Sequence, residues 1–382
     1  MPATEYGNAR VEERIELDNL LDFGSGAAVI SRTGELNLDS SAAHAIDGMA
    51  VTSWISAPGA SDEQLVFSLL APVRVKSVGV TTAPEQYVPA SLRFEGSNDG
   101  ERWRELATIE PKDARERQLA DVQEPTTARF IRVTVLGKER YYVGARTLHV
   151  LGEEVGPPRT PSFTGCWTIN GVPARITQEG ARITGVIQSD PPTFLDGGTN
   201  NRMAMINWIQ GPTRGYAALT RSSDGKHLTG VTFHEEIQDL FTGAAWFGEV
   251  CGDTPTSPLA APGAFLETAG RYSIYGLAFD PNERLDEELS ASALDAVAKL
   301  LRDAPQQRFR ITSREFRLET AALNARRTGA RLTALRNALR ARGIDTSRLE
   351  LIAAGNQWIG PPITSPAQLL LACRIDIEKV GR

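Results

Sequence analysis

The sequence predicts a multi-domain protein: an all-β sandwich, then a small antiparallel β-barrel, then an α/β two-layer sandwich. Its 382 residues exceed the length of one ordinary domain. Two clusters rich in Pro, Gly and Thr, GEEVGPPRTPS at 152–162 and CGDTPTSPLAAPG at 251–263, divide the chain. Short strands precede the second cluster, and alternating strands and helices follow it. We therefore expect domains at residues 16–154, 160–255 and 264–382.

Composition and charge indicate a globular protein and disfavour several other kinds. The chain is 41% hydrophobic and 23% charged, which is typical of a folded globular protein. A net charge of −6 disfavours a protein that coats nucleic acid. Only six of the 41 basic residues are lysines, a weak indication of a GC-rich bacterial genome. No run of about 18 apolar residues predicts a transmembrane segment. The start, MPATEYGNARVEERIELD, lacks the apolar core of a secretory signal, so we expect a cytoplasmic protein or one whose leader has been removed.

The first part contains short apolar runs separated by turns: LVFSLL, VKSVGVTT, SLRFEGS, RFIRVTVLG and TLHVLG. Runs of this length and spacing predict a β-sandwich. The segments AHAIDGMAVTSW, VFSLLAPVRVKSVGV, FEGSNDGERW and ARFIRVTV resemble, in this order, the discoidin family, also called coagulation-factor type C or galactose-binding-like. The resemblance implies a jelly-roll sandwich that binds glycans, lipids or proteins through loops at one end.

Aromatic residues of this part divide into two groups. Tyr87 in PEQYVP, and Tyr141 and Tyr142 in ERYYVG, lie in polar, turn-rich loops, where sandwiches carry their binding residues. These tyrosines are the predicted ligand-binding residues, although tyrosines beside Pro and Gly also pack loops. Trp54 and Trp103 lie in motifs whose tryptophan usually points inward, so we expect both in the core.

Asp47 in AIDG is a candidate calcium ligand, because the resemblance implies a structural calcium ion at this acidic turn. Calcium binds six to eight oxygens, mostly from carboxylates and carbonyls. Where the family supplies a late carboxylate, this chain has Thr147 and His149. The alternative is that Asp47 caps its own turn. Calcium is the one cofactor that the resemblance implies for this chain.

The middle part runs from FTGCWTINGVPARITQEGARITGVI to KHLTGVTFHEEIQDLFTGAAWFGEVC, and its alternating apolar residues and Gly turns predict a closed antiparallel meander. Its G-x-W start resembles small lipocalin-like barrels, which implies that Trp167 closes one end. Cys166 and Cys251 bracket this part, so a disulfide would join the first and last strands; free thiols are the alternative. FHEEIQ has Gln238 where a zinc-protease helix needs its second histidine, so no zinc site is expected.

The last part alternates predicted strands, GRYSIYGLAF, QRFRITS, RLELIAAG and LLLACRIDIEKV, with two predicted helices, SASALDAVAKLLRDAP and LNARRTGARLTALRNALRARGID. The order is β-α-β-α-β-β, which predicts a two-layer sandwich. Leu294, Val297, Ala298 and Leu301 form the apolar stripe of the first helix; Leu332, Leu335 and Leu339 form that of the second, which should end at Gly343. Cys373 is expected to be a small core residue.

YGLAFD, ARGIDTSRLELIAAG and CRIDIE resemble the OmpA-like family that docks outer-membrane proteins onto peptidoglycan. Asn324 and Arg331 match the family's motif, but Phe316 stands where the family has the aspartate that, with the arginine, holds the diaminopimelate branch of the wall peptide. Arg331 can still clamp a carboxylate. Glu315 replaces the lost acid if the loop shifts by one residue.

The other arginines of this helix are spread around it without interleaved aromatics, which is typical of a solvated face and disfavours nucleic acid as a partner. Together these features predict a non-catalytic bacterial cell-envelope protein, periplasmic or associated with the outer membrane. It would bind or tether a glycan, weakly peptidoglycan, or other envelope proteins. The alternative is a structural subunit of a larger assembly whose domains are protein interfaces. No convergent nucleophile and base favour an enzyme.

Overall fold

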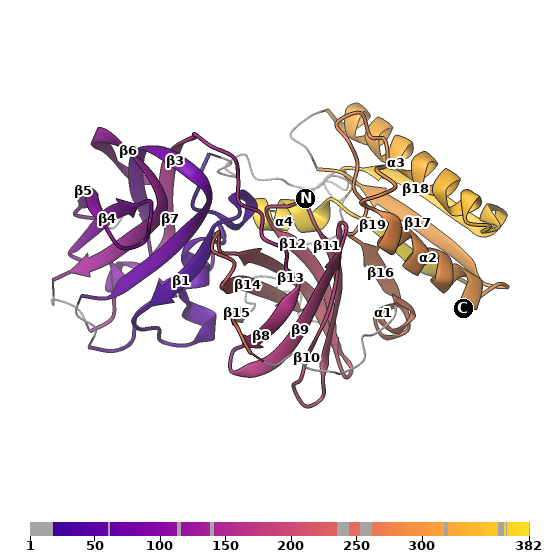
Figure 1. The fold of residues 1–382 in the computed structure, drawn as a ribbon, viewed down its shortest axis with the longest axis horizontal. Helices are drawn as coiled ribbons and strands as arrows, with labels where there is room; N and C mark the ends of the chain where they lie inside the picture. Colours follow the sequence, from indigo (N-terminus) through magenta and orange to yellow (C-terminus); the bar gives the residue numbers. More distant parts are fainter. Residues whose placement is uncertain are drawn as a thin grey trace, which may run out of the picture.

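The computed structural model describes residues 18–59, 62–112, 116–137, 141–234, 244–252, 262–316, 320–357, 363 and 365–381. Three parts lie in a row in Figure 1: a sandwich on the left, a barrel in the middle and an α/β part on the right. In the described part of the chain, no helix is both long and apolar enough to cross a membrane.

The sandwich has seven strands, in the order β2-β7-β3-β6-β4-β5 with β1 beside β3. They are β1 (Ala28–Arg32), β2 (Trp54–Ile55), β3 (Gln64–Thr82), β4 (Ser91–Ser97), β5 (Arg104–Ile109), β6 (Gln118–Leu136) and β7 (Gly144–Glu154). Short 3-10 turns add η2 (Phe23–Ser25), η3 (Leu38–Ser40), η4 (Ala42–Ala45) and η5 (Glu85–Tyr87). The predicted sandwich is confirmed. One detail differs: β3 unites two predicted strands, and its register shifts between Ser68 and Val73, where Pro72 has no amide proton to donate.

The middle part is a closed barrel of eight strands, in the order β10-β11-β12-β13-β14-β15-β8-β9, which confirms the predicted antiparallel barrel. The strands are β8 (Gly165–Ile169), β9 (Val172–Glu179), β10 (Arg182–Ile187), β11 (Thr193–Thr199), β12 (Ala204–Gln210), β13 (Thr213–Arg221), β14 (His227–His234) and β15 (Ala245–Val250). A barrel of eight strands is just wide enough for its own side chains to fill it. Trp167, fully buried, packs there with Ile206 and Trp208 and donates from Nε1 to the Phe163 carbonyl at 3.1 Å.

The α/β part has a four-stranded mixed sheet, in the order β16-β19-β17-β18. Its elements are α1 (Pro262–Ala269), β16 (Arg271–Ile274), α2 (Ala291–Asp303), β17 (Arg308–Arg314), α3 (Ala321–Ala341), η6 (Thr346–Arg348), β18 (Leu349–Gly355), α4 (Pro366–Ala372) and β19 (Ile375–Val380). Both predicted apolar stripes are buried against Phe309 and Ile311 of β17. Gly343, with a φ of +75°, follows the end of α3, as predicted.

Two strand predictions in this part are right over only part of their length. The run LLLACRIDIEKV begins in the helix α4 and is a strand only in β19, so the order from α1 to β19 is α-β-α-β-α-β-α-β. A capping box that the sequence analysis missed starts α4: Ser365 accepts from the Gln368 amide and the Gln368 side chain accepts from the Ser365 amide, each at 3.2 Å. GRYSIYGLAF is a strand only in β16, because the chain then leaves the sheet to line a cavity.

Helix α4 ties the C-terminal part to the N-terminal part. It packs against η2 of the sandwich, and Figure 1 shows it in yellow between the two. A Cβ atom at Gly24 would lie 2.8 Å from Cβ of Pro366, so the close approach of α4 requires glycine there. Leu371 of α4, Phe23 of η2 and Tyr216 of β13 belong to one hydrophobic cluster. This cluster therefore contains residues of all three parts, whereas the barrel interior and the α/β sheet have cores of their own.

Buried hydrogen bonds also join the barrel to both neighbours. On the sandwich side, the Val29 amide donates to Thr229 Oγ1 at 2.9 Å, and this hydroxyl donates back to the Val29 carbonyl at 3.1 Å. On the other side, the Tyr272 hydroxyl donates to Asp196 Oδ1 at 2.8 Å. Asp196 is fully buried and also pairs with Arg182 at 2.5 Å. Because the Val29, Thr229, Tyr272 and Asp196 groups meet partners across these interfaces, the interfaces have a defined geometry.

Candidate binding sites

The three predicted tyrosines meet at one end of the sandwich. Tyr87 lies in η5, just after β3, and Tyr141 and Tyr142 lie just before β7. These loops are neighbours because the end of β3 pairs with the start of β7, Thr82 opposite Ala145. The ring centroids of Tyr141 and Tyr142 are 4.8 Å apart at an interplanar angle of 83°, and those of Tyr87 and Tyr142 are 6.4 Å apart at 76°. We call these three residues the tyrosine cluster.

The tyrosine cluster is held in place and open to solvent. The Gly59 amide donates to the Tyr141 carbonyl at 2.8 Å. Ser56 and Val143 share two hydrogen bonds: the Ser56 amide donates to the Val143 carbonyl, and the Ser56 hydroxyl accepts from the Val143 amide. Tyr87 and Tyr142 are half-buried, but Tyr141 is 64% exposed. A ring this exposed contributes little to packing the loop. The cluster presents an aromatic corner to solvent, with adjacent rings nearly perpendicular.

The two sandwich tryptophans differ. Trp54 is 1% exposed and lies in the core, as predicted. The prediction that Trp103 is buried is wrong: its ring is half-buried and the guanidinium of Arg132 lies 4.5 Å from its centroid. Arg132 is fixed by two 2.8 Å hydrogen bonds to Glu95. Trp103 therefore covers a partly buried ion pair, an arrangement that its sequence motif does not distinguish from a core position.

Asp47 caps its own turn. Its Oδ1 accepts from the Met49 amide at 2.8 Å and its Oδ2 lies 2.9 Å from His44 Nδ1, while the Thr52 hydroxyl contacts both oxygens. Burial raises the pKa of Asp47, with the hydrogen bond from His44 opposing it. Its oxygens already accept protein donors, so the residues do not fit a calcium ion. Among the described residues, no group of three or more His, Cys, Asp and Glu is arranged to hold a metal.

Cys166 and Cys251 form a disulfide, with their Cα atoms 5.2 Å apart. It joins β8 to the residue that follows β15, and these two strands pair to close the barrel. The bond therefore lies at the barrel seam, where the sequence placed it. Cys373 is not part of a disulfide; it is half-buried instead of lying in the core, and its sulfur accepts a hydrogen bond from the Phe316 amide at 3.3 Å.

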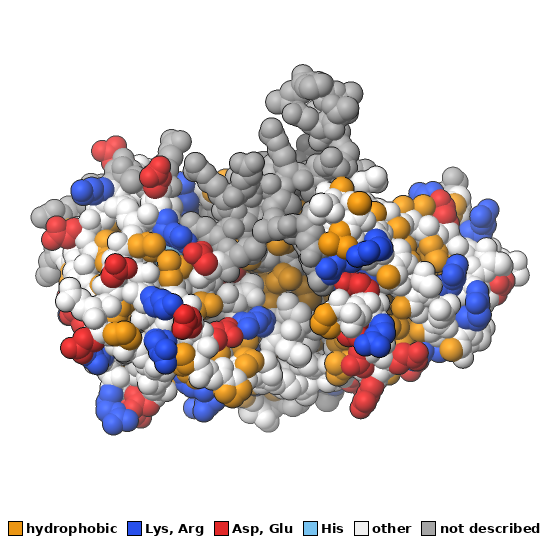
Figure 2. Space-filling view, turned by 90° about the horizontal axis from the view of Figure 1, so that it is seen from above, with side chains coloured by type: hydrophobic (Ala, Val, Ile, Leu, Met, Phe, Trp, Pro, Cys, Tyr) orange, Lys and Arg blue, Asp and Glu red, His pale blue; other side chains and the backbone are white. Residues whose placement is uncertain are grey.

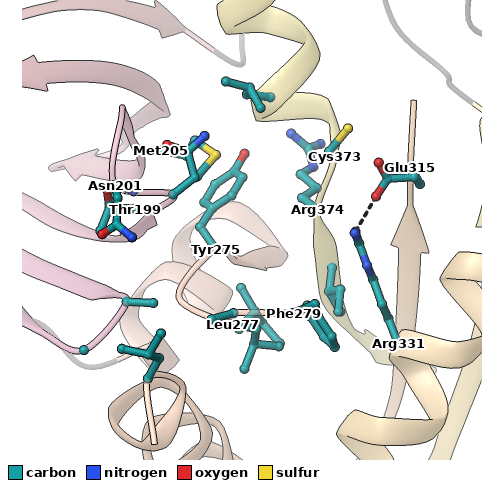
Figure 3. A pocket seen from close by; sticks show the side chains of 18 of the residues that line it. Thr199, Asn201, Met205, Tyr275, Leu277, Phe279, Glu315, Arg331, Cys373 and Arg374 are labelled. Atoms are coloured by element: carbon teal, nitrogen blue, oxygen red, sulfur yellow. Dashed lines mark hydrogen bonds and ion pairs between the residues drawn. The ribbon is translucent and has the colours of Figure 1, made fainter. Parts of the chain in front are cut away.

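A cavity of about 520 Å³ lies between the barrel and the α/β part. Figure 3 shows its barrel wall at Thr199, Asn201 and Met205, and the side chains of Glu315 and Arg331 pointing toward each other on the opposite side. These two groups form an ion pair. Arg331 also donates from Nε to Glu283 at 2.6 Å, and the same carboxylate accepts from Arg327 at 2.9 Å.

The predicted OmpA-like residues are thus only partly brought together. Glu315 lies against Arg331 and both line the cavity. Phe316 is 1% exposed and packs with Ile363 and Ala372. Asn324 is buried in α3 at 1% exposure and does not line the cavity. Sequence reasoning missed Glu283, because an acid 32 residues before Glu315 carries no signal of its position.

Behind the cavity, Asp376 of β19 is surrounded by arginines. It pairs with Arg314 at 2.6 Å and with Arg374 at 3.0 Å, and it accepts from the Ser273 hydroxyl at 2.6 Å. Burial acts to raise the pKa of Asp376, but Arg374, Arg271 and Arg314 outweigh it and hold the pKa below its usual value. Asp376 is therefore an anion in the folded protein at neutral pH.

The face of the molecule seen in Figure 2 does not carry charges of a single sign. On the face seen in Figure 2, blue Lys and Arg side chains and red Asp and Glu side chains are intermixed over both ends of the molecule. Nucleic-acid binding needs basic side chains gathered on one surface. The visible face gives no support for such a partner.

Comparison with known proteins finds a match in the first part. The F5/8 type C domain model matches residues 28–147. Among solved structures, the C-terminal domain of a chitobiase from Bacteroides fragilis is 20% identical, with a TM-score of 0.33, covering 35% of this chain and 97% of that chain. The family 32 CBM from C. perfringens NanJ, in complex with galactose, is 20% identical, with a TM-score of 0.30, covering 33% and 94%. A comparison with curated proteins finds no match.

Proposed function

Because residues 28–147 form an F5/8 type C domain, we propose that this chain is a non-catalytic carbohydrate-binding protein that holds its glycan at the tyrosine cluster. The observation that carries the proposal is the exposure of Tyr141 within a fixed group of three rings. The C–H face of a sugar packs on an aromatic face, and the phenol hydroxyls donate to and accept from sugar hydroxyls. The cluster supplies both kinds of contact.

The compartment is part of the proposal. A disulfide persists in oxidising surroundings, so Cys166–Cys251 supports a place outside the cytoplasm. We place the protein in the bacterial cell envelope, in the periplasm or at the outer membrane. The alternative, a subunit of a larger assembly, predicts that native material elutes at several times the 41.4 kDa mass of one chain.

Calorimetric titration of the full chain, with ligands first selected on a glycan array, tests the tyrosine cluster. We expect Tyr141→Ala to weaken binding about tenfold or more, the loss of roughly 1.4 kcal/mol. Tyr141→Phe keeps the ring and should retain most of the affinity. Trp103→Ala is the matched control, since it removes a half-buried aromatic of the same domain. Unchanged binding by Tyr141→Ala together with loss of binding by Trp103→Ala would move the site to Trp103.

A second candidate function uses the cavity of Figure 3. The observation that favours it is that Glu315, one residue before Phe316, supplies an acid against Arg331. Such a pair can hold the ammonium and carboxylate groups of the diaminopimelate branch of peptidoglycan. The two groups already pair with each other, and Arg331 also with Glu283, so a ligand must displace these contacts. We therefore propose weak, salt-sensitive association with the wall.

Pulldown with purified sacculi tests this second function. Arg331→Ala should remove binding and Glu315→Gln should weaken it. Arg326→Ala is the control, because Arg326 is an exposed arginine of the same helix outside the cavity. Binding by the wild type that survives Arg331→Ala would refute the assignment. Phe316→Asp is unsuitable for gain of function, because Phe316 is 1% exposed and a carboxylate there would be buried.

A further inference from the structure

The arginines along α3 and just past its end differ in whether they form ion pairs. At the start of the helix, Arg327 and Arg331 share the carboxylate of Glu283. Just past its end, Arg342 pairs with Asp295 at 2.9 Å. Between them, Arg336 and Arg340 form no ion pair with any described residue. They lie four residues apart, so their side chains project from the same face of the helix.

Arg336 and Arg340 line a second hollow, of about 510 Å³, together with Ile344, Asp345, Thr346 and Ser347. The Arg340 guanidinium donates to Thr346 Oγ1 at 3.3 Å. The Nε atom of Arg336 is buried and has no hydrogen-bond partner in the described structure. An arginine whose buried donor is unpaired has lost hydration without compensation, so a bound acceptor would restore what folding removed. The hollow thus gathers the Arg336 guanidinium with its unpaired buried Nε, the exposed Arg340 guanidinium bonded to Thr346, and the hydroxyls of Thr346 and Ser347.

We propose that this hollow binds the phosphate group of a phosphorylated saccharide. Two arginines fit a dianionic phosphate ester, which accepts several charge-assisted hydrogen bonds. The volume exceeds that of a lone phosphate and leaves room for a sugar ring beside Ile344. No aromatic side chain is among the described residues of its lining, so a nucleobase would find no stacking partner. The site is separate from the tyrosine cluster and from the cavity of Figure 3.

The surroundings set the strength of this binding. The carboxylate of Asp345 accepts from the Ser347 amide at 2.9 Å and remains in the hollow as a negative charge. The carbonyl end of α3 adds a partial negative charge nearby. Both reduce the positive potential of the two arginines. We therefore expect a dissociation constant on the order of 1 mM at low ionic strength, weakening as salt is added.

The full chain titrated with glucose 6-phosphate, glucose 6-sulfate, glucose and inorganic phosphate tests the proposal. We expect glucose 6-phosphate to bind best, glucose not to bind, and Arg336→Gln and Arg340→Gln each to weaken binding about tenfold. Arg326→Gln removes an exposed arginine of the same helix outside the hollow and should change nothing. Gln is a good helix former, so α3 should persist, and circular dichroism checks this.

Three outcomes would overturn the proposal. Unchanged affinity in the Arg336→Gln/Arg340→Gln double variant would place the phosphate elsewhere. Equal affinity for inorganic phosphate and glucose 6-phosphate would show an anion site without a place for the sugar. Equal affinity for the sulfate ester would show that the dianion is not selected.

Discussion

Replacing Asp376 by asparagine tests whether this one carboxylate stabilises the fold by neutralising Arg314 and Arg374. Asp376 is 1% exposed and neutralises Arg314 and Arg374, whose side chains are 19% and 5% exposed. Arg374 cannot move to water easily, because its guanidinium also lies 4.7 Å from the ring centroid of Tyr216 in the barrel. Asparagine keeps the shape and loses the charge. Removing one partner of a buried pair costs about 3–5 kcal/mol, so we expect the free energy of unfolding to fall by that amount.

Urea unfolding followed by helical circular dichroism measures this loss, because all four described α-helices belong to the C-terminal part. Asp295→Asn is the control: its side chain is 70% exposed and it pairs with Arg342. An exposed ion pair contributes about 0–1 kcal/mol, so this variant should unfold almost like the wild type. If Asp376→Asn and Asp295→Asn unfolded within 1 kcal/mol of each other, the argument from buried charge would be refuted.

The pH dependence gives a second check. The arginines hold the folded-state pKa of Asp376 below its ordinary value of 3.8. A depressed pKa contributes stability above the unfolded-state pKa, and this contribution disappears as the pH falls through the folded-state value. The stability gap between wild type and Asp376→Asn should therefore be constant near neutral pH and shrink below about pH 3.8. A gap that widened with acid would contradict the assigned sign.

Three other changes test the packing. Trp54→Ala should lower the free energy of unfolding by about 3–5 kcal/mol, and Trp103→Ala by about 1 kcal/mol, because only the Trp54 ring lies in the core. Equal urea midpoints of the two variants would contradict this. The Cys166–Cys251 bond joins residues 85 apart in the sequence, so its loss should lower the free energy of unfolding by about 4 kcal/mol. Non-reducing peptide mapping that finds two free thiols would contradict this prediction. Ser365→Ala should cost about 1 kcal/mol by removing the cap of α4, measured against Ser365→Thr, which keeps the hydroxyl; no difference would show that the capping box contributes nothing.

The spacing of apolar residues along the sequence correctly predicted those helices and strands whose packing partners are close in the sequence or many in number. The stripes of α2 and α3 are visible because helical spacing alone places Leu294 and Leu301, or Leu332 and Leu339, on one face. The barrel was visible because regular strands with short turns close on themselves. The prediction at LLLACRIDIEKV is right for β19 but missed α4, because an apolar run does not distinguish a strand from a buried helix and the deciding signal was the cap at Ser365.

The candidate sites were predictable to different degrees. Loop composition identified Tyr87, Tyr141 and Tyr142 separately, but only strand pairing shows that their rings touch. The cavity could not be predicted, because its walls come from two parts of the chain that sequence reasoning treats as independent domains. Glu283 could not be predicted either, because its contact with Arg331 of the same part spans 48 residues.

The packing of α4 against η2 sets an order of events during synthesis. The last sandwich strand ends at Glu154, whereas Leu371, which completes the cluster around Phe23, is made more than 200 residues later. At about 5–20 residues per second, the ribosome needs roughly 10 to 40 seconds to supply that helix. During this time the side chains around Phe23 that pack against α4 lack this partner. A chaperone that recognises apolar segments should therefore bind the growing chain at these side chains until the final helix arrives.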